Sequence, residues 1–252
     1  MARLTEIVEY LDVELDLAEV PDYPAAHNGL QLQNRGEVTK VAAAVDASLP
    51  VIRKAIDEGA DLLVVHHGLF WQGVQKLVGA PYQKFAEAIE AGLAIYSAHI
   101  PLDRHPEYGN NALMAEAIGM DNWEAYHPWK GTLLGVRQSM DISLDDLQQR
   151  VSTAVGGAVH VCPGRQSGTV GMVGLVTGGA GSEIESMAAQ GIDTFITGEG
   201  QHWTYPLAEE LGVNMLYAGH YQTETFGVKK LASLIGDKWA IESCFIDHPT
   251  GL

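Results

Sequence analysis

The stretch DASLPVIRKAIDEGADLLVVHH, residues 46–67, decides the fold class. Ser48 is a favourable N-cap, and the pattern that follows it predicts a helix running toward Gly59. The short apolar run DLLVVH (61–66) then predicts a buried strand. A second apolar run, VTKVAAAVD (38–46), precedes the helix and predicts another strand. Together they form a β-α-β unit of the kind found in α/β proteins with largely buried sheets.

The same alternation of helix and strand patterns continues along most of the chain. The segment EAYHPWKGT (124–132) breaks it, because it lacks periodicity and carries Pro and Gly. We therefore expect an α/β protein of two lobes with mostly buried mixed sheets. The expected lobes are residues 1–125, joined by the C-terminal segment 225–252, and residues 126–224.

A weak internal repeat supports two similar lobes. Residues 46–67 align with GGAGSEIESMAAQGIDTFITGE (178–199), and residues 92–103 align with GVNMLYAGHYQTE (212–224). Any two β-α units share this alternation of helix and strand by chance. Here, however, polar residues recur at matching strand ends, which favours a duplication. These polar residues are His66-His67 and Gly198-Glu199 in one pair, and His99…Asp103 and His220…Glu224 in the other.

Composition and charge exclude several classes of protein. Hydrophobic residues make up 46 % of the chain and charged residues 19 %, so a core can form. No apolar run is long enough to cross a membrane, and the first residues lack the layout of a secretion signal, so a cytoplasmic location is expected. The net charge of −17, without a basic cluster, disfavours binding to a nucleic-acid duplex. Cys162 and Cys244 form no Cys-x-x-Cys unit and are expected to be free thiols.

The polar residues at the strand ends predict a metal site. Open α/β sheets bind ligands beyond the carboxyl ends of their strands. Side chains of neighbouring strand residues point to opposite faces, so two histidines within a strand could not easily share one ion. Placed past the end of the strand, His66 and His67 could serve two adjacent ions. His220 and Glu224 are four residues apart and would share one face of a helical turn. A lone His-His pair is more often a core feature, but with Asp103 the set favours a dinuclear site for Zn, Mn, Fe or Co.

Three segments carry a resemblance to a known family: VVHHGLFW (64–71), SAHIPLDRHPEYGNN (97–111) and AGHYQTETFGVKKL (218–231). With HNGLQLQ (27–33) and CFIDHP (244–249), they resemble the Nif-three-like family, also named GTP cyclohydrolase I type 2 homologues, in its short bacterial form without the inserted central domain. The resemblance implies two α/β lobes, a dinuclear metal site in the cleft between them, and a toroidal homo-hexamer. It also implies the ligands: His66 and His220 for one ion, His67 and Asp103 for the other, and Glu224 bridging them.

Further polar residues lie beside the expected ligands. His99 has no ligand counterpart in the family, so we interpret it as a residue that orients a metal ligand or as a catalytic acid or base, with packing or capping as the alternative. Glu199 is a second candidate for proton transfer. His202 could face the same cleft or be a solvated surface residue. Asn110-Asn111 are expected to cap the helix that follows. The loop TGGAGSE (177–183) lacks a Walker lysine, so a tight turn is favoured over a phosphate site.

These residues predict a dinuclear metal-dependent hydrolase that acts on a small molecule, with a metal-bridged hydroxide as the nucleophile. His99 or Glu199 would move protons. The family name suggests a nucleotide substrate and a GTP cyclohydrolase-like ring opening, although the sequence shows no triphosphate pocket. The alternative is a non-catalytic hexameric metal-binding scaffold or a regulatory interaction protein. Five ligands for two ions leave open coordination positions, which favours catalysis.

Overall fold

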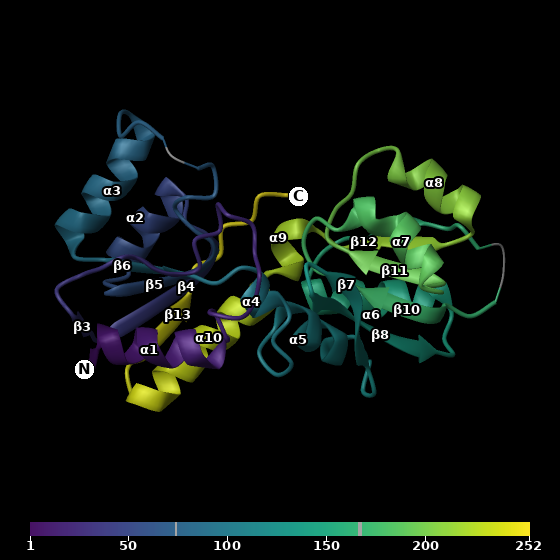
Figure 1. The fold of residues 1–252 in the computed structure, drawn as a ribbon, viewed down its shortest axis with the longest axis horizontal. Helices are drawn as coiled ribbons and strands as arrows, with labels where there is room; N and C mark the ends of the chain where they lie inside the picture. Colours follow the sequence, from purple (N-terminus) through teal and green to yellow (C-terminus); the bar gives the residue numbers. More distant parts are fainter. Residues whose placement is uncertain (74, 166–167) are drawn as a thin grey trace. The chain divides into compact units, whose positions relative to one another are not determined.

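The computed structural model describes residues 1–73, 75–165 and 168–252 and shows a mixed α/β fold (Figure 1). The chain divides into two compact units. Unit 1 is Met1–Leu102 with Gly227–His248, and unit 2 is Asp103–Phe226 with Pro249–Leu252. The first lobe was expected to extend to residue 125, whereas the first segment of unit 1 ends at Leu102. The reason is α5 (Asn110–Ala117), whose Met114 and Ala115 are buried in the core of unit 2.

Unit 1 is built on a five-stranded sheet of order β13-β4-β5-β6-β2. Only β2 is antiparallel to its neighbour. The strands are β2 (Gly29–Leu32), β4 (Lys40–Asp46), β5 (Leu62–His67), β6 (Ala94–Ser97) and β13 (Glu242–Phe245), and β1 (Ala2–Arg3) pairs with β3 (Glu37–Val38). The helices are α1 (Leu4–Glu14), α2 (Leu49–Asp57), α3 (Ala80–Ala91), the one-turn α4 (Ile100–Asp103) and α10 (Thr225–Trp239), the last two running across the unit boundaries.

The sheet of unit 1 is covered on both faces, as its apolar strands predict. Val41 and Ala43 of β4 pack into a cluster with residues of α1 and α10. The alternate residues, Ala42 and Ala44, pack into a second cluster with residues of α2 and α3, in keeping with the two-residue period of a strand. Ser48 caps α2 as expected, because its Oγ accepts a hydrogen bond from the backbone of Val51.

Unit 2 is built on a six-stranded mixed sheet of order β7-β8-β10-β11-β12-β9. The three strands β10, β11 and β12 are parallel, and the others are antiparallel to their neighbours. The strands are β7 (Glu124–Trp129), β8 (Thr132–Met140), β9 (His160–Cys162), β10 (Gly171–Leu175), β11 (Thr194–Thr197) and β12 (Asn214–Tyr217). The helices, besides α5, are α6 (Leu144–Val155), η1 (Gly181–Glu183), α7 (Ile184–Ala189), α8 (Thr204–Leu211) and the one-turn α9 (His220–Thr223).

The two units share a local plan. The order β4-α2-β5-α3-β6-α4 in unit 1 matches β10-α7-β11-α8-β12-α9 in unit 2, and in both sheets the three strands are parallel neighbours. The segments that align in the sequence fall on these matching elements. The polar residues at the aligned strand ends therefore occupy equivalent places in their own sheets.

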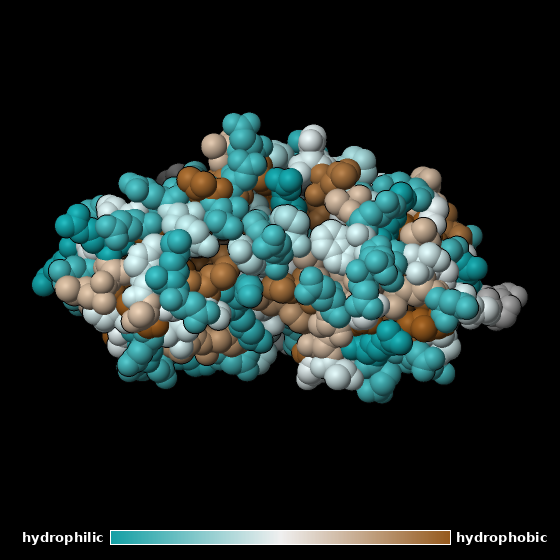
Figure 2. Space-filling model, turned by 90° about the horizontal axis from the view of Figure 1, so that it is seen from below, coloured by the Kyte–Doolittle hydropathy of each residue, from teal (hydrophilic) through white to brown (hydrophobic). Residues whose placement is uncertain are grey.

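The surface agrees with the composition. The face drawn in Figure 2 is largely hydrophilic, with apolar residues in separate areas. Within the described ranges, no helix combines the length and the apolar character that a membrane crossing needs.

Candidate metal centre

Three histidines of unit 1 lie together at the carboxyl edge of its sheet. His66 and His67 are the last two residues of β5, rather than lying past its end, and His99 follows β6, the next strand in the sheet. Their ring centroids are 4.8, 4.9 and 5.6 Å apart. One nitrogen of each ring lies within 4.8 Å of the others, a spacing that could hold a metal ion.

The hydrogen bonds of His66 and His67 fix the tautomer of each ring. Nδ1 of His66 lies 2.9 Å from the carbonyl oxygen of Ala98, and Nδ1 of His67 lies 2.9 Å from Oδ1 of Asp46. Both oxygens can only accept, so both Nδ1 atoms donate, and Nε2 carries the lone pair of the neutral ring. A histidine oriented in this way by an acceptor is the usual form of a metal ligand.

His99 is held by a buried carboxylate from the segment before β2. Its Nδ1 lies 2.8 Å from Oδ1 of Asp22, whose other oxygen accepts from the side chain of Asn28 at 2.7 Å. Burial raises the pKa of Asp22. Its hydrogen bonds, above all the one with His99, and the charge of His99 outweigh burial, so the pKa lies below its usual value. Trp71 packs its ring edge-on against His99 at 4.5 Å. Sequence reasoning did not identify Asp22 or Asn28 as parts of this site.

In unit 2, one histidine lies between two carboxylates. His220 begins α9, and its Nε2 lies 3.1 Å from Oε1 of Glu224, which confirms that the four-residue spacing puts them on one face. Its Nδ1 lies 2.9 Å from Oε1 of Glu199, just past β11. Burial lowers the pKa of His220, but the hydrogen bonds and charges of Glu224 and Glu199 outweigh it and raise the pKa from 6.5 to about 9.

The glycine loop of residues 177–183 shapes the surroundings of Glu224. Gly178 has a φ of +70°, and a Cβ there would overlap Oε1 of Glu224. The backbone N–H groups of Gly178, Ala180 and Gly181 are all hydrogen-bonded within unit 2. Because these donors already have acceptors, the loop is a tight turn beside Glu224 and does not offer them to a phosphate.

Asp103 is buried in a polar network of unit 2. Its Oδ1 accepts from Nδ2 of Asn110 at 2.8 Å and from Oγ1 of Thr177 at 3.3 Å, and its carbonyl accepts from Nδ2 of Asn111 at 3.0 Å. The expectation that the two asparagines cap the helix was wrong. Gly109 holds the N-cap position of α5, and both asparagine side chains are buried in its first turn, where they hold Asp103.

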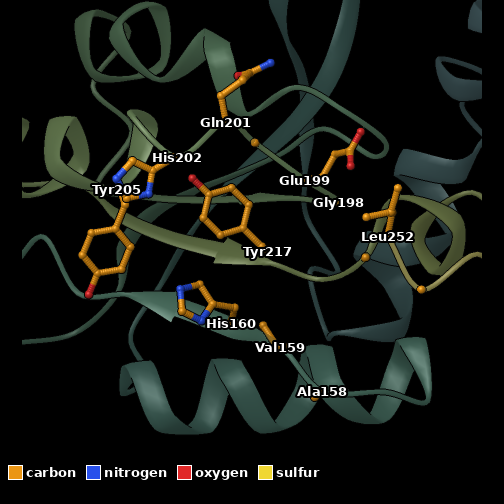
Figure 3. Close-up of a pocket in the computed structure, with 13 residues that line it drawn as sticks. Ala158, Val159, His160, Gly198, Glu199, Gln201, His202, Tyr205, Tyr217 and Leu252 are labelled. Carbon is orange, nitrogen blue, oxygen red and sulfur yellow. The ribbon is translucent and has the colours of Figure 1, made fainter.

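His202 is exposed and borders a cavity of about 840 Å³ in unit 2 (Figure 3). Glu199 borders the same cavity. The expectation that His202 faces the cleft of the metal ligands is a separate one and stays a prediction. The other ring-bearing residues of the lining are His160, Tyr205 and Tyr217. Sequence reasoning missed these three because they come from distant parts of the chain and form no motif.

The fold and these side chains together define a class: a mixed α/β protein whose strand ends present histidines and carboxylates able to ligate metal ions. The family model Duf34/NIF3 (NGG1p interacting factor 3) matches residues 2–251, and the chain belongs to this family.

Relatives support the same assignment over the full length. The chain is 39 % identical to a protein of Deinococcus radiodurans, over 98 % of this chain and 94 % of the relative, and 37 % identical to a protein of Archaeoglobus fulgidus, over 99 % and 100 %. Both relatives are named GTP cyclohydrolase 1 type 2 homolog. Among solved structures, the protein TTHA1606 from Thermus thermophilus is similar, with 36 % identity, a TM-score of 0.87, and coverage of 99 % of this chain and 100 % of that chain.

Proposed function

We propose that this protein is a hydrolase of small molecules that uses two divalent metal ions. The proposed ligands are His66 and His67 from unit 1 and Asp103, His220 and Glu224 from unit 2. As the family resemblance implies, these five residues would bind one pair of ions. The observation that carries the proposal is the way the three ligand histidines are held. An acceptor binds Nδ1 of each ring, so that Nε2 is directed to a metal.

The residues fit divalent ions chemically. Three imidazoles and two carboxylates suit Zn, Mn, Fe or Co better than Mg or Ca. Asp103 and Glu224 are 6 % and 3 % exposed, and buried carboxylates are costly unless a cation or hydrogen bonds compensate them. His220 points both nitrogens at carboxylates, so a proton bridges its Nε2 and Glu224. A place between a carboxylate and an imidazole that favours a proton also suits a metal cation.

Two ions, when bound, would lower the pKa of a water that they share and supply hydroxide near neutral pH. The chain itself would handle the protons. His99 has its Nδ1 fixed by the ionised Asp22, and its ring contacts both His66 and His67. We assign to His99 the transfer of a proton at Nε2. Glu199, predicted to transfer protons as well, keeps Oε1 on His220 and is proposed to orient that ring.

The names of the relatives suggest a narrower reaction, the opening of the purine ring of GTP by water. Its test is direct: the metal-loaded protein is incubated with GTP, and formate is measured. Formate production dependent on metal and on Glu224 would support this reaction. A lack of formate would count against GTP and would leave the wider class, metal-dependent hydrolysis, open to other substrates.

The hydrolase proposal is tested with metal analysis and a substrate screen. We expect the reconstituted chain to bind about two ions, and we expect Glu224→Ala and His67→Ala to lose ions together with activity on phosphoester, amide or cyclic substrates. Glu185→Ala, an exposed acid on α7, is the control for loss of a carboxylate. A chain that binds no ions, or activity that survives in both variants, would show that the metal mechanism is wrong.

The competing proposal is a metal-binding scaffold without catalysis. A toroidal homo-hexamer is proposed for either function, and light scattering measures it. Variants that lose ions and assembly, in a protein that hydrolyses nothing in the screen, would favour the scaffold. Variants that keep their assembly but lose hydrolysis would favour the enzyme.

A further inference from the structure

The cavity in unit 2 has the size and lining of a ligand site. Its volume of about 840 Å³ falls in the range of about 300–1,000 Å³ that is usual for small-molecule pockets. Residues of unit 2 alone line it, from the ends of β9, β11 and β12, from the start of α8, and from Gly251 and Leu252. The cavity therefore belongs to one compact unit.

Aromatic rings form one side of the cavity. His160 and Tyr217 are cross-strand partners on β9 and β12, and their rings are nearly parallel, at 22° with centroids 6.1 Å apart. The ring of Tyr205, from α8, lies 5.9 Å from that of His160 at 40°. Figure 3 shows the three rings on the same side of the space. Rings of this kind bind a flat conjugated ligand by stacking.

The ring of Tyr217 is held in place by its surroundings. Its hydroxyl is hydrogen-bonded to Oγ1 of Thr204, which donates to the carbonyl of Gln201 at 2.6 Å. Gly200 makes room for the ring, because a Cβ at that position would lie 2.7 Å from its Cε1. A fixed ring loses little conformational freedom when a ligand stacks on it.

The polar lining differs from that of a phosphate site. Among the described residues around the cavity, none is Lys or Arg. Among the described lining residues, the acidic side chain is that of Glu199, which is 44 % exposed and lies across from the aromatic rings (Figure 3). A carboxylate attracts N–H donors and repels phosphate. The amide of Gln201 adds a donor and an acceptor.

We propose that this cavity binds a planar nitrogen heterocycle that carries an N–H donor and no phosphate. The heterocycle packs against the aromatic side formed by His160, Tyr205 and Tyr217, and its N–H group donates to Glu199. Because Glu199 also holds His220, the bound ring lies next to a proposed metal ligand. Its identification as the conjugated part of the hydrolase substrate rests on the proposed function, whereas the binding itself does not.

Fluorescence of 2-aminopurine riboside tests this proposal, because stacking on aromatic rings quenches it. We expect saturable quenching by the wild-type protein and competition by adenosine. N6,N6-dimethyladenosine, which keeps the ring but loses the exocyclic N–H groups, should compete about tenfold less well or worse, as expected for a lost hydrogen bond to a carboxylate. GTP should also compete less well than adenosine, because of its phosphates.

Variants locate the binding. His160→Ala and Tyr205→Ala should weaken binding about fivefold or more, the lower end of what a base-stacking aromatic contributes. Tyr82→Ala, an exposed tyrosine on α3 of unit 1, is the matched control and should bind like wild type. The proposal is overturned by quenching that does not saturate, by equal competition from adenosine and its dimethyl analogue, or by unchanged binding in both cavity variants.

Measurement on wild-type protein stripped of metal with a chelator separates the two proposals. Saturable, cavity-dependent binding without metal supports the heterocycle site, even if the protein hydrolyses nothing. Metal-dependent hydrolysis in a protein that never binds the fluorescent riboside overturns the heterocycle site and leaves the hydrolase intact.

Discussion

Glu199 Oε1 lies 2.9 Å from Nδ1 of His220, so a residue from the end of β11 fixes the ring of a proposed metal ligand on α9. On its other nitrogen, the same ring meets Glu224. That Glu199 transfers protons stays a prediction from the sequence, and its contact in the structure orients the ring of His220. This contact also links the proposed metal ligand to the aromatic cavity, which Glu199 borders.

Removing the orienting carboxylate should weaken metal binding without unfolding the protein. We expect Glu199→Ala to lower metal affinity about 10- to 100-fold, the usual effect of losing such a contact. Glu199→Gln should have a smaller effect, because its amide oxygen can still accept from Nδ1. Isothermal titration with Zn²⁺ or Mn²⁺ measures both. The exposed Glu185→Ala should bind as wild type does, and equal affinities for all four proteins would contradict the orienting role.

Asn110 should matter for stability, because it donates to the buried carboxylate of Asp103 at 2.8 Å. Asn110→Ala leaves that carboxylate short of a donor and should lower the free energy of unfolding by about 1–3 kcal/mol. Urea unfolding followed by circular dichroism measures the loss. The exposed Asn122→Ala should change stability by less than about 0.5 kcal/mol. An unchanged free energy of unfolding in Asn110→Ala would mean that the burial of Asp103 does not depend on this hydrogen bond.

Local patterns predicted much of the fold. The helix cap at Ser48 and the four-residue spacing of His220 and Glu224 are confirmed, because each depends on neighbours within one turn of chain. Long-range partners could not be found in this way. Asp22 lies 77 residues from His99, and nothing in their spacing marks the pair.

Two misreadings have a physical cause. Asn110 begins a helix, where a cap is the usual role, but its side chain donates to the buried carboxylate of Asp103, and Gly109 holds the N-cap position. The unit boundary was placed after residue 125 because EAYHPWKGT breaks the pattern. Met114 and Ala115 nevertheless pack into the core of unit 2, so the boundary precedes their helix.

The protonation of His220 should make the stability of the metal-stripped protein depend on pH. Its pKa is raised from 6.5 to about 9 in the folded chain. A raised pKa contributes stability in full below about 6.5, and this contribution is lost as the pH rises through about 9. The free energy of unfolding, measured in urea at a series of pH values, should therefore fall across this window. His220→Asn should lack this fall, and identical profiles for the variant and wild type would assign the effect to another group.

Gly178 should be required for the proposed metal site and not only for the turn. Gly178→Ala and Gly156→Ala both place a Cβ on a left-handed residue, at φ values of +70° and +67°, so each should cost about 1–2 kcal/mol of stability. At Gly156, the C-cap of α6, nothing lies within 4 Å of the added Cβ. At Gly178 the Cβ meets Oε1 of Glu224 and must displace it.

The pair of variants therefore separates backbone strain from damage to the site. We expect Gly156→Ala to bind metal ions like wild type, and Gly178→Ala to bind them at least about tenfold more weakly, because the displaced carboxylate no longer faces His220. Isothermal titration measures the affinity, and urea unfolding checks that the two variants lose similar stability. Equal metal affinity in both variants would show that Glu224 adjusts to the added methyl group, and that the turn does not set its position.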